Sequence, residues 1–218
     1  MEKHEKITIP NYSLSEEIIN AITHGVASCL SVWWLVMLII KASSKGSLAV
    51  VAVTLFGASM IILYLISCIY HSLSKKLRGK KVLRVIDHCN VFLLVYGTII
   101  PVSLLGIGGE FGWLCFGFST LITLIGILSS CINLDRMKCF EVGCHLLNGW
   151  GVLLYIDTLI GNIGLMGVLL LISGGIVYTN GAILYGIGSR KKYFHSVFHF
   201  LCMIGTFLHY LTIYFYIL

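Results

Sequence analysis

The sequence predicts an all-α membrane protein, a bundle of seven transmembrane helices. Of its 218 residues, 58% are hydrophobic and only 11% are charged, whereas a soluble domain carries about 25% charged residues. Seven apolar runs are each long enough to cross the hydrocarbon core, which takes about 20 residues. The basic residues cluster on alternate connections between these runs, as an odd number of spans requires.

The connections between the apolar runs are short, so we expect residues 1–218 to form a single membrane domain without a soluble one. The polar N-terminus, Met1–Ser15, lacks the apolar core and cleavage site of a signal peptide, and the first run is therefore expected to remain as a span. The predicted spans are Ile18–Ile40, Leu48–Leu73, Val82–Ile107, Phe111–Cys131, Phe140–Ile160, Leu165–Ile187 and Phe194–Leu218.

Local signals mark the ends of several predicted helices. Ser13 followed by Glu16 is the pattern of a capping box and predicts the start of the first helix. Gly46 precedes the second span. Pro101 lies late in the third span, where proline is expected to kink the helix or mark its end.

The basic residues predict the orientation. Thirteen of the fifteen Lys and Arg fall on the side of the N-terminus, and only Lys41 and Lys45 fall on the other side. The positive-inside rule then places the N-terminus in the cytoplasm and the C-terminus outside. The thirteen are Lys3, Lys6, Lys75, Lys76, Arg78, Lys80, Lys81, Arg84, Arg136, Lys138, Arg190, Lys191 and Lys192.

The excess of Lys and Arg on one side, which sets the orientation, is enough to account for the net charge of +6. We therefore expect the basic loop Lys75–Arg84 to contact anionic lipid headgroups and expect no nucleic-acid partner. The eight cysteines lie mostly in apolar runs and form no CxxC pair. This pattern favours buried free thiols over a zinc finger or a disulfide framework.

Ionisable groups inside spans are costly and suggest a function. In the predicted topology, His71, Asp87, His195 and His199 come to one depth near the cytoplasmic boundary. His195 and His199 are four residues apart and share a helix face, as Ser67 and His71 do. Three histidines can hold a catalytic metal ion and leave its fourth position open. Asp87 would accept a proton, and Ser67 would supply a hydrogen bond.

Other interpretations of these polar residues remain open. An HxxxH pair occurs in helices without metal, and histidines at membrane boundaries are often merely interfacial. We expect His24 to hydrogen-bond to a neighbouring helix. His209 lies about 15 Å along the helix from His199, so we expect it to hydrogen-bond inside the bundle instead of binding the same ion. Glu16 and Glu17 are expected to be a helix cap and a surface residue.

Four segments together resemble the bacterial hemolysin III family, part of the superfamily of progestin and adiponectin receptors. They are Glu16–Gly25 (EEIINAITHG), Ser67–His71 (SCIYH), Asp87–Asn90 (DHCN) and His195–His199 (HSVFH). The resemblance covers nearly the whole chain, and the combination of the motifs in this order is specific although each alone is not.

The resemblance implies a seven-helix bundle with a cytoplasmic N-terminus in the cell (inner) membrane of a bacterium. It also implies a Zn²⁺ ion held by His71, His195 and His199. Asp87 matches the aspartate that holds the metal-bound water, and Ser67 matches the serine of the motif. The chain lacks the long N-terminal region of the eukaryotic receptors, which argues against hormone signalling.

Three hypotheses of function follow. The first is a zinc-dependent hydrolase of a lipid amide or ester, by analogy with the related receptors and ceramidase-like proteins, with membrane lipids as substrate and partners. The second is a non-enzymatic regulator of membrane fluidity with structural zinc. The third, pore formation, predicts a polar stripe through the bilayer, but the polar residues cluster at one end. The oligomeric state stays open.

Overall fold

The computed structural model describes residues 7–188 and 191–218. Among these residues the regular structure is entirely helical, without strands. The elements are α1 (Leu14–Ala42), η1 (Ser43–Lys45), α2 (Ser47–Ser72), α3 (Gly79–Pro101), η2 (Val102–Ile107), α4 (Gly109–Trp150), η3 (Gly151–Tyr155), α5 (Ile156–Gly188), α6 (Phe194–Thr212) and η4 (Ile213–Ile217).

Five helical stretches of the described chain are long and apolar enough to cross a membrane. Together with the many large apolar side chains that face outward, they identify an all-α membrane protein, as the composition predicts. The five stretches are Leu14–Lys45, Ser47–Ser72, Gly79–Ile107, Gly109–Gly186 and Phe194–Ile217.

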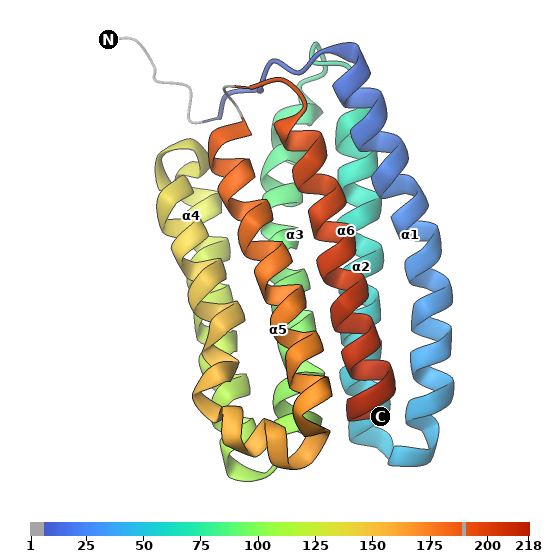
Figure 1. Ribbon diagram of the computed structural model, residues 1–218. Coiled ribbons are helices and arrows are strands. Elements are labelled where there is room, and N and C mark those ends of the chain that lie inside the picture. The colour runs from blue at the N-terminus through green and yellow to red at the C-terminus, as the bar shows by residue number, and fades with distance from the viewer. Residues whose placement is uncertain (1–6, 189–190) are drawn as a thin grey trace.

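The longest stretch, Gly109–Gly186, is not one straight helix. Its 78 residues would extend about 117 Å as a straight α-helix, far more than a hydrocarbon core of about 30 Å. Two residues within it leave the helical conformation: Asn133 (φ −164°, ψ 90°) and Gly164 (φ 73°, ψ 163°). The chain reverses direction near each of them (Figure 1). Only glycine adopts the Gly164 conformation without strain.

Signals in the sequence account for other helix ends. Ser13 and Glu16 form the predicted capping box, in which each side chain hydrogen-bonds to the other residue's backbone. Gly46, at φ 97°, allows the sharp turn from η1 into α2. α3 ends at Pro101, as predicted, and continues as the π-helical turn η2.

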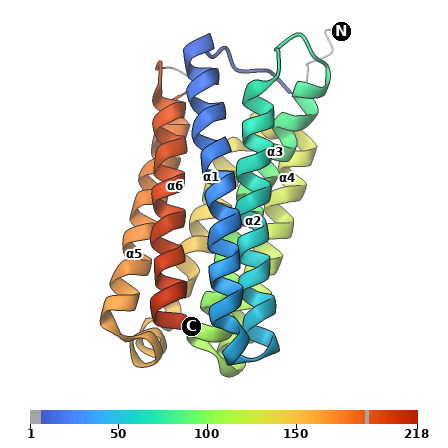
Figure 2. The same ribbon diagram turned by 90° about the vertical axis from the view of Figure 1, so that its right-hand side faces the viewer.

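The helices form a closed bundle in which α1 packs against α2 and α6, α3 packs against α2 and α4, and α5 packs against α6 (Figures 1 and 2). α1, α3 and α6 begin at the end of the bundle where α2 ends, and the C-terminus lies at the other end (Figure 1). The first turns of α1, α3 and α6 and the last turn of α2 therefore lie at the same end of the bundle. Lys3, Lys6 and Arg190, which the charge count also uses, lie outside the described residues.

Candidate metal centre

Three histidines from two helices meet where α2 ends and α6 begins. His71 lies in the last turn of α2, and His195 and His199 lie one turn apart at the start of α6. All three are buried, with 2%, 8% and 1% of their surface exposed. One ligand atom of each lies within 4.8 Å of the other two. The structure thus brings together the three histidines singled out from the sequence, and their binding of a metal stays a prediction.

The spacing of the ring nitrogens suits a single small cation. Nε2 of His195 and Nε2 of His199 are 3.1 Å apart. Two nitrogens that bind one tetrahedral zinc ion, each at about 2.0–2.1 Å, lie about 3.3 Å apart. The ring centroid of His71 lies 5.3 Å from that of His195 and 4.9 Å from that of His199. The three rings therefore surround a common point.

A buried carboxylate fixes the orientation of His71. Oε2 of Glu17 lies 2.6 Å from Nδ1 of His71 and accepts a hydrogen bond from its N–H. The other oxygen, Oε1, accepts from the Lys80 ammonium at 2.8 Å, and this lysine is fully buried. Because Nδ1 is engaged, Nε2 of His71 is left to face His195 and His199. Carboxylate–histidine pairs of this kind orient metal ligands and raise their basicity.

The assignment of Glu17 to the surface is wrong, because its exposed fraction is 9% and it contacts His71. A signal for this position is present in the sequence. Glu17, Asn20 and His24 follow one another at spacings of three and four, so they share one face of α1. Extending the polar stripe of Asn20 and His24 by one turn would have led to Glu17.

Several buried polar atoms around the three histidines have no hydrogen-bond partner in the described part of the chain. They include Nε2 of His71, Nδ1 of His199 and the side-chain nitrogen and oxygen of Asn20. Buried polar groups almost always have a partner. A zinc ion fits this donor set, because it binds neutral imidazole nitrogens and would engage the orphaned Nε2 of His71.

His24 contributes to the site by packing. Its ring stacks on that of His199, with centroids 3.7 Å apart and an angle of 15°. The expected hydrogen bond to a neighbouring helix is absent from the described structure, since both ring nitrogens of His24 lack a partner.

Asp87 and Ser67 lie beside the histidines. Asp87, on α3, and Ser67, one turn before His71 on α2, line the same cavity as His195 and His199. The Ser67 hydroxyl is in hydrogen-bonding reach of the Asp87 carboxyl. The structure thus places both residues beside the histidines, and their roles stay predictions.

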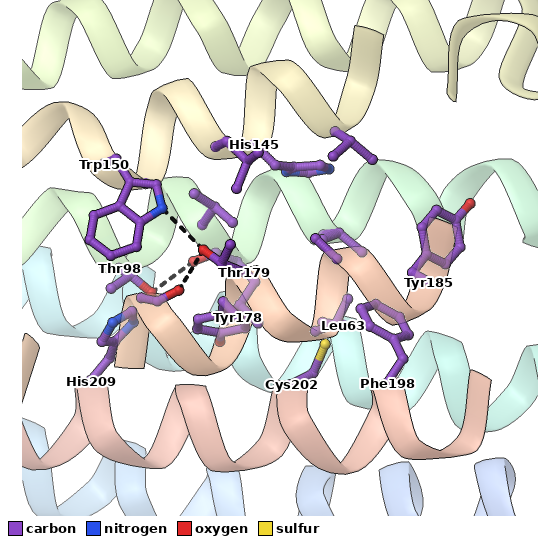
Figure 3. A pocket seen from close by; sticks show the side chains of 18 of the residues that line it. Leu63, Thr98, His145, Trp150, Tyr178, Thr179, Tyr185, Phe198, Cys202 and His209 are labelled. Carbon is purple, nitrogen blue, oxygen red and sulfur yellow. Dashed lines mark hydrogen bonds between the residues drawn. The ribbon is translucent and has the colours of Figure 1, made fainter. Parts of the chain in front are cut away.

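An apolar cavity of about 150 Å³ extends from the histidines into the bundle. Figure 3 shows its wall, which ends at His209 and Trp150. Nε2 of His209 lies 3.2 Å from the Leu171 carbonyl, which confirms the hydrogen bond predicted for this histidine inside the bundle. The Trp150 indole donates to the Thr179 hydroxyl at 3.1 Å. The wall is otherwise mostly apolar and suits an alkyl chain.

A second cavity, of about 700 Å³, adjoins the first at His195 and is mostly polar. It includes part of the segment that precedes α1, in which Tyr12 stacks on His195 with ring centroids 4.7 Å apart. Burial raises the pKa of Tyr12 and keeps its hydroxyl protonated. The two cavities share four lining residues, namely Asp87, His88, Tyr185 and His195. The edge of the candidate metal centre formed by His195 and Asp87 therefore lies where a polar and an apolar space meet.

Comparisons with known proteins identify related sequences. The family described as "Haemolysin-III related" matches residues 12–210. Hemolysin-3 from Bacillus cereus is 34% identical over 215 residues, which cover 98% of this chain and 97% of that protein. A hemolysin-3 homolog from Bacillus subtilis (strain 168) is 34% identical over 196 residues, which cover 89% and 91% of the two chains.

Proposed function

The chain belongs to the haemolysin-III-related family, and on that premise we propose that it is a zinc-dependent hydrolase of a membrane lipid. The observation that carries the proposal is the junction of the two cavities. His195, one of the three clustered histidines, and Asp87 line both a polar and an apolar space, and His199 lines the apolar one. An acyl lipid has the same division, with its carbonyl between a polar head and an apolar chain.

Seven spans with a cytoplasmic N-terminus are part of the proposal. The interruptions at Asn133 and Gly164 fall between the predicted spans, and the distribution of the basic residues favours this orientation. The metal centre would then lie near the inner leaflet. The bacterial cell membrane is the proposed location, since both relatives come from Bacillus.

His71, His195 and His199 would hold the zinc ion, and Glu17 would keep Nε2 of His71 turned toward it. Zinc in a three-histidine site polarises a carbonyl and lowers the pKa of a bound water to about 7. Asp87 lines the same cavity as His195 and His199. Asp87 is therefore suited to orient a water molecule and take its proton.

The hydrolysis balances with one water molecule. The water oxygen bonds to the acyl carbonyl carbon, and the C–N or C–O bond to the rest of the lipid breaks. Asp87 takes one water proton and passes it to the leaving nitrogen or oxygen. Ser67 holds the Asp87 carboxyl in position, and the apolar cavity takes the acyl chain. The products are a fatty acid and an amine or alcohol.

A pore, the activity that the relatives' names suggest, fits the cavities less well. A water-filled path needs polar groups along its whole length. Beyond the histidines the cavity wall is mostly apolar, with isolated polar groups at its far end.

Zinc content tests the metal centre. We expect the purified protein to contain about one zinc per chain and the His195→Ala/His199→Ala variant to contain none. His209→Ala is the matched control, because His209 is a buried histidine of the same helix that bonds to the Leu171 carbonyl instead. Equal zinc in the double variant and the wild type would refute the site.

Lipid analysis by mass spectrometry tests hydrolysis. Purified protein in vesicles of bacterial lipid should release fatty acid, and Asp87→Asn should reduce the release at least about 100-fold while zinc content stays unchanged. Normal zinc without any lipid turnover in the wild type would instead support the non-enzymatic regulator of membrane fluidity.

A further inference from the structure

The polar cavity next to the metal centre is lined by charged residues of both signs. Its cationic residues come from α3, from α4 beyond Asn133 and from the turn before α6; they are Arg84, Lys138, Lys191 and Lys192. Its acidic residues are Glu16, Asp87 and Asp135. Whether the cavity attracts an anion depends on which of these charges already have partners.

Both of the acidic residues outside the metal centre are already engaged. Oδ1 of Asp135 accepts from Arg84 at 2.7 Å, and its other oxygen accepts from the Thr8 backbone at 2.8 Å and the Thr8 hydroxyl at 2.9 Å. Glu16 accepts from the Ser13 backbone at 2.8 Å, the Ser13 hydroxyl at 2.7 Å and the Tyr193 backbone at 2.7 Å. Arg84 compensates the charge of Asp135. The donors to Glu16 are all neutral, so Glu16 keeps a negative charge, which acts on Lys192.

The lysines of this cavity contact no carboxylate in the described part of the chain, although Lys138 donates to the Tyr185 carbonyl at 3.4 Å. In the described structure, none of Lys138, Lys191 and Lys192 has a carboxylate within 4.0 Å. Their ammonium groups lie over aromatic rings, at 4.1 Å from the Tyr185 centroid for Lys138 and 5.5 Å from that of Phe194 for Lys191. Lys138 is half-buried, and Tyr185 lines both cavities. The cations therefore surround a space that adjoins Asp87.

We propose that Lys138 and Lys191, with Lys192, bind a phosphate group on the polar end of an acyl lipid. Lysine ammonium groups bind phosphate as point charges, and two chain segments supply them here. A lipid held in this way would pass its carbonyl beside Asp87 and its acyl chain into the apolar cavity. That such a lipid is also hydrolysed depends on the proposed function. The substrate class would then be acyl lipids that carry a phosphate group.

The positive-inside bias alone would also place lysines on this side. Lys138 differs from lysines that serve only to set the orientation, because it lines the polar cavity. Arg136, two residues earlier, is exposed and does not line the polar cavity. A purely topological role predicts the same effect for both residues, whereas a phosphate site predicts an effect for Lys138 alone.

The test measures lipid binding without turnover. The full chain, in detergent micelles, is titrated with dioctanoyl phosphatidylglycerol, dioctanoyl phosphatidylcholine and inorganic phosphate, and bound ligand is counted by native mass spectrometry. The wild type, Lys138→Gln, Lys191→Gln and the control Arg136→Gln are compared. Each protein is measured zinc-free and zinc-loaded, so that failure of the zinc proposal and failure of the phosphate site are distinguishable.

We expect the anionic lipid to bind more tightly than the zwitterionic one. Lys138→Gln and Lys191→Gln should each weaken its binding about fivefold, and Arg136→Gln should leave it unchanged. Equal losses in Lys138→Gln and Arg136→Gln, or equal binding of the two lipids by the wild type, would overturn the site. Displacement of the lipid by inorganic phosphate at similar concentration would overturn the assignment to a lipid.

Discussion

At the scale of single residues, the contact between Glu17 and His71 sets which ring nitrogen of His71 is available to bind a metal. Glu17 binds Nδ1 of His71 with one oxygen and the Lys80 ammonium with the other. The hydrogen bond and the charge of Lys80 hold the carboxylate ionised and in place, against the effect of its burial. This chain of contacts gives His71 one tautomer and one orientation before a metal arrives.

Replacing Glu17 by Gln should weaken zinc binding about 10–100-fold, because the amide cannot hold His71 with the charge of a carboxylate. Competition with a chromophoric chelator measures the affinity. Glu16→Gln is the matched control, since Glu16 precedes Glu17 but caps α1. An unchanged zinc affinity in Glu17→Gln would mean that the carboxylate does not orient the ligand.

Part of this site could be predicted from the sequence and part could not. The i, i+4 spacing of His195 and His199, and their depth near that of His71, predict the three-histidine cluster. The contacts of Glu17 and Lys80 depend on which face of α1 packs on α2, and a single sequence does not specify the rotation of one helix against another. The same reason explains why His24 was expected to hydrogen-bond and instead stacks on His199.

At the scale of elements, the segment before α1 is held across the polar cavity by contacts with two other parts of the chain. Thr8 hydrogen-bonds to Asp135 of α4, and Arg84 of α3 binds both the Thr8 carbonyl and Asp135. Burial would raise the pKa of Asp135, but the Arg84 guanidinium and the Thr8 donors lower it from 3.8 to about 2. Asp135 is therefore ionised at neutral pH.

Asp135→Asn should loosen this segment, because it removes the charge that Arg84 and Thr8 share. Hydrogen exchange of peptides covering residues 8–12 should become faster, while exposed Asp157→Asn at the far end of the bundle should have no effect. The depressed pKa means that ionised Asp135 stabilises the segment above about pH 4, with the effect lost toward pH 2. Unchanged exchange in Asp135→Asn would contradict this role.

The element boundaries themselves were largely predictable. Ser13 with Glu16, Gly46 and Pro101 each act as expected. Asn133 was not singled out, although it lies between two predicted spans, because no proline or glycine marks the position. The structure explains the break, since Oδ1 of Asn133 accepts from the Arg136 backbone at 3.1 Å and caps the following helix.

At the scale of the whole molecule, the buried polar residues of the candidate site and the main apolar core occupy different parts of the bundle. The end where α1, α3 and α6 begin holds the histidines and the polar cavity. One apolar core cluster that includes Phe56, Met60 and Tyr64 packs α2 against α1, α3 and α6. The candidate metal centre at one end of the bundle is thus supported by a core that holds the helices together along their length.

The proposed orientation predicts which positions react from outside the cell. A cysteine introduced by Ser44→Cys, in the turn between α1 and α2, should react with a membrane-impermeant maleimide in spheroplasts. The native Cys139, exposed at the opposite end of the bundle, should react only after the membrane is opened. The reverse pattern would invert the topology and place the metal centre near the outer leaflet.

The central claim, that His71, His195 and His199 hold one zinc ion, is tested most directly by X-ray absorption of the purified zinc protein. We predict a first coordination sphere of nitrogen and oxygen at about 2.0–2.1 Å with the scattering pattern of three imidazoles. A sulfur shell at about 2.3 Å, from any of the eight cysteines, or fewer than three imidazoles, would contradict it.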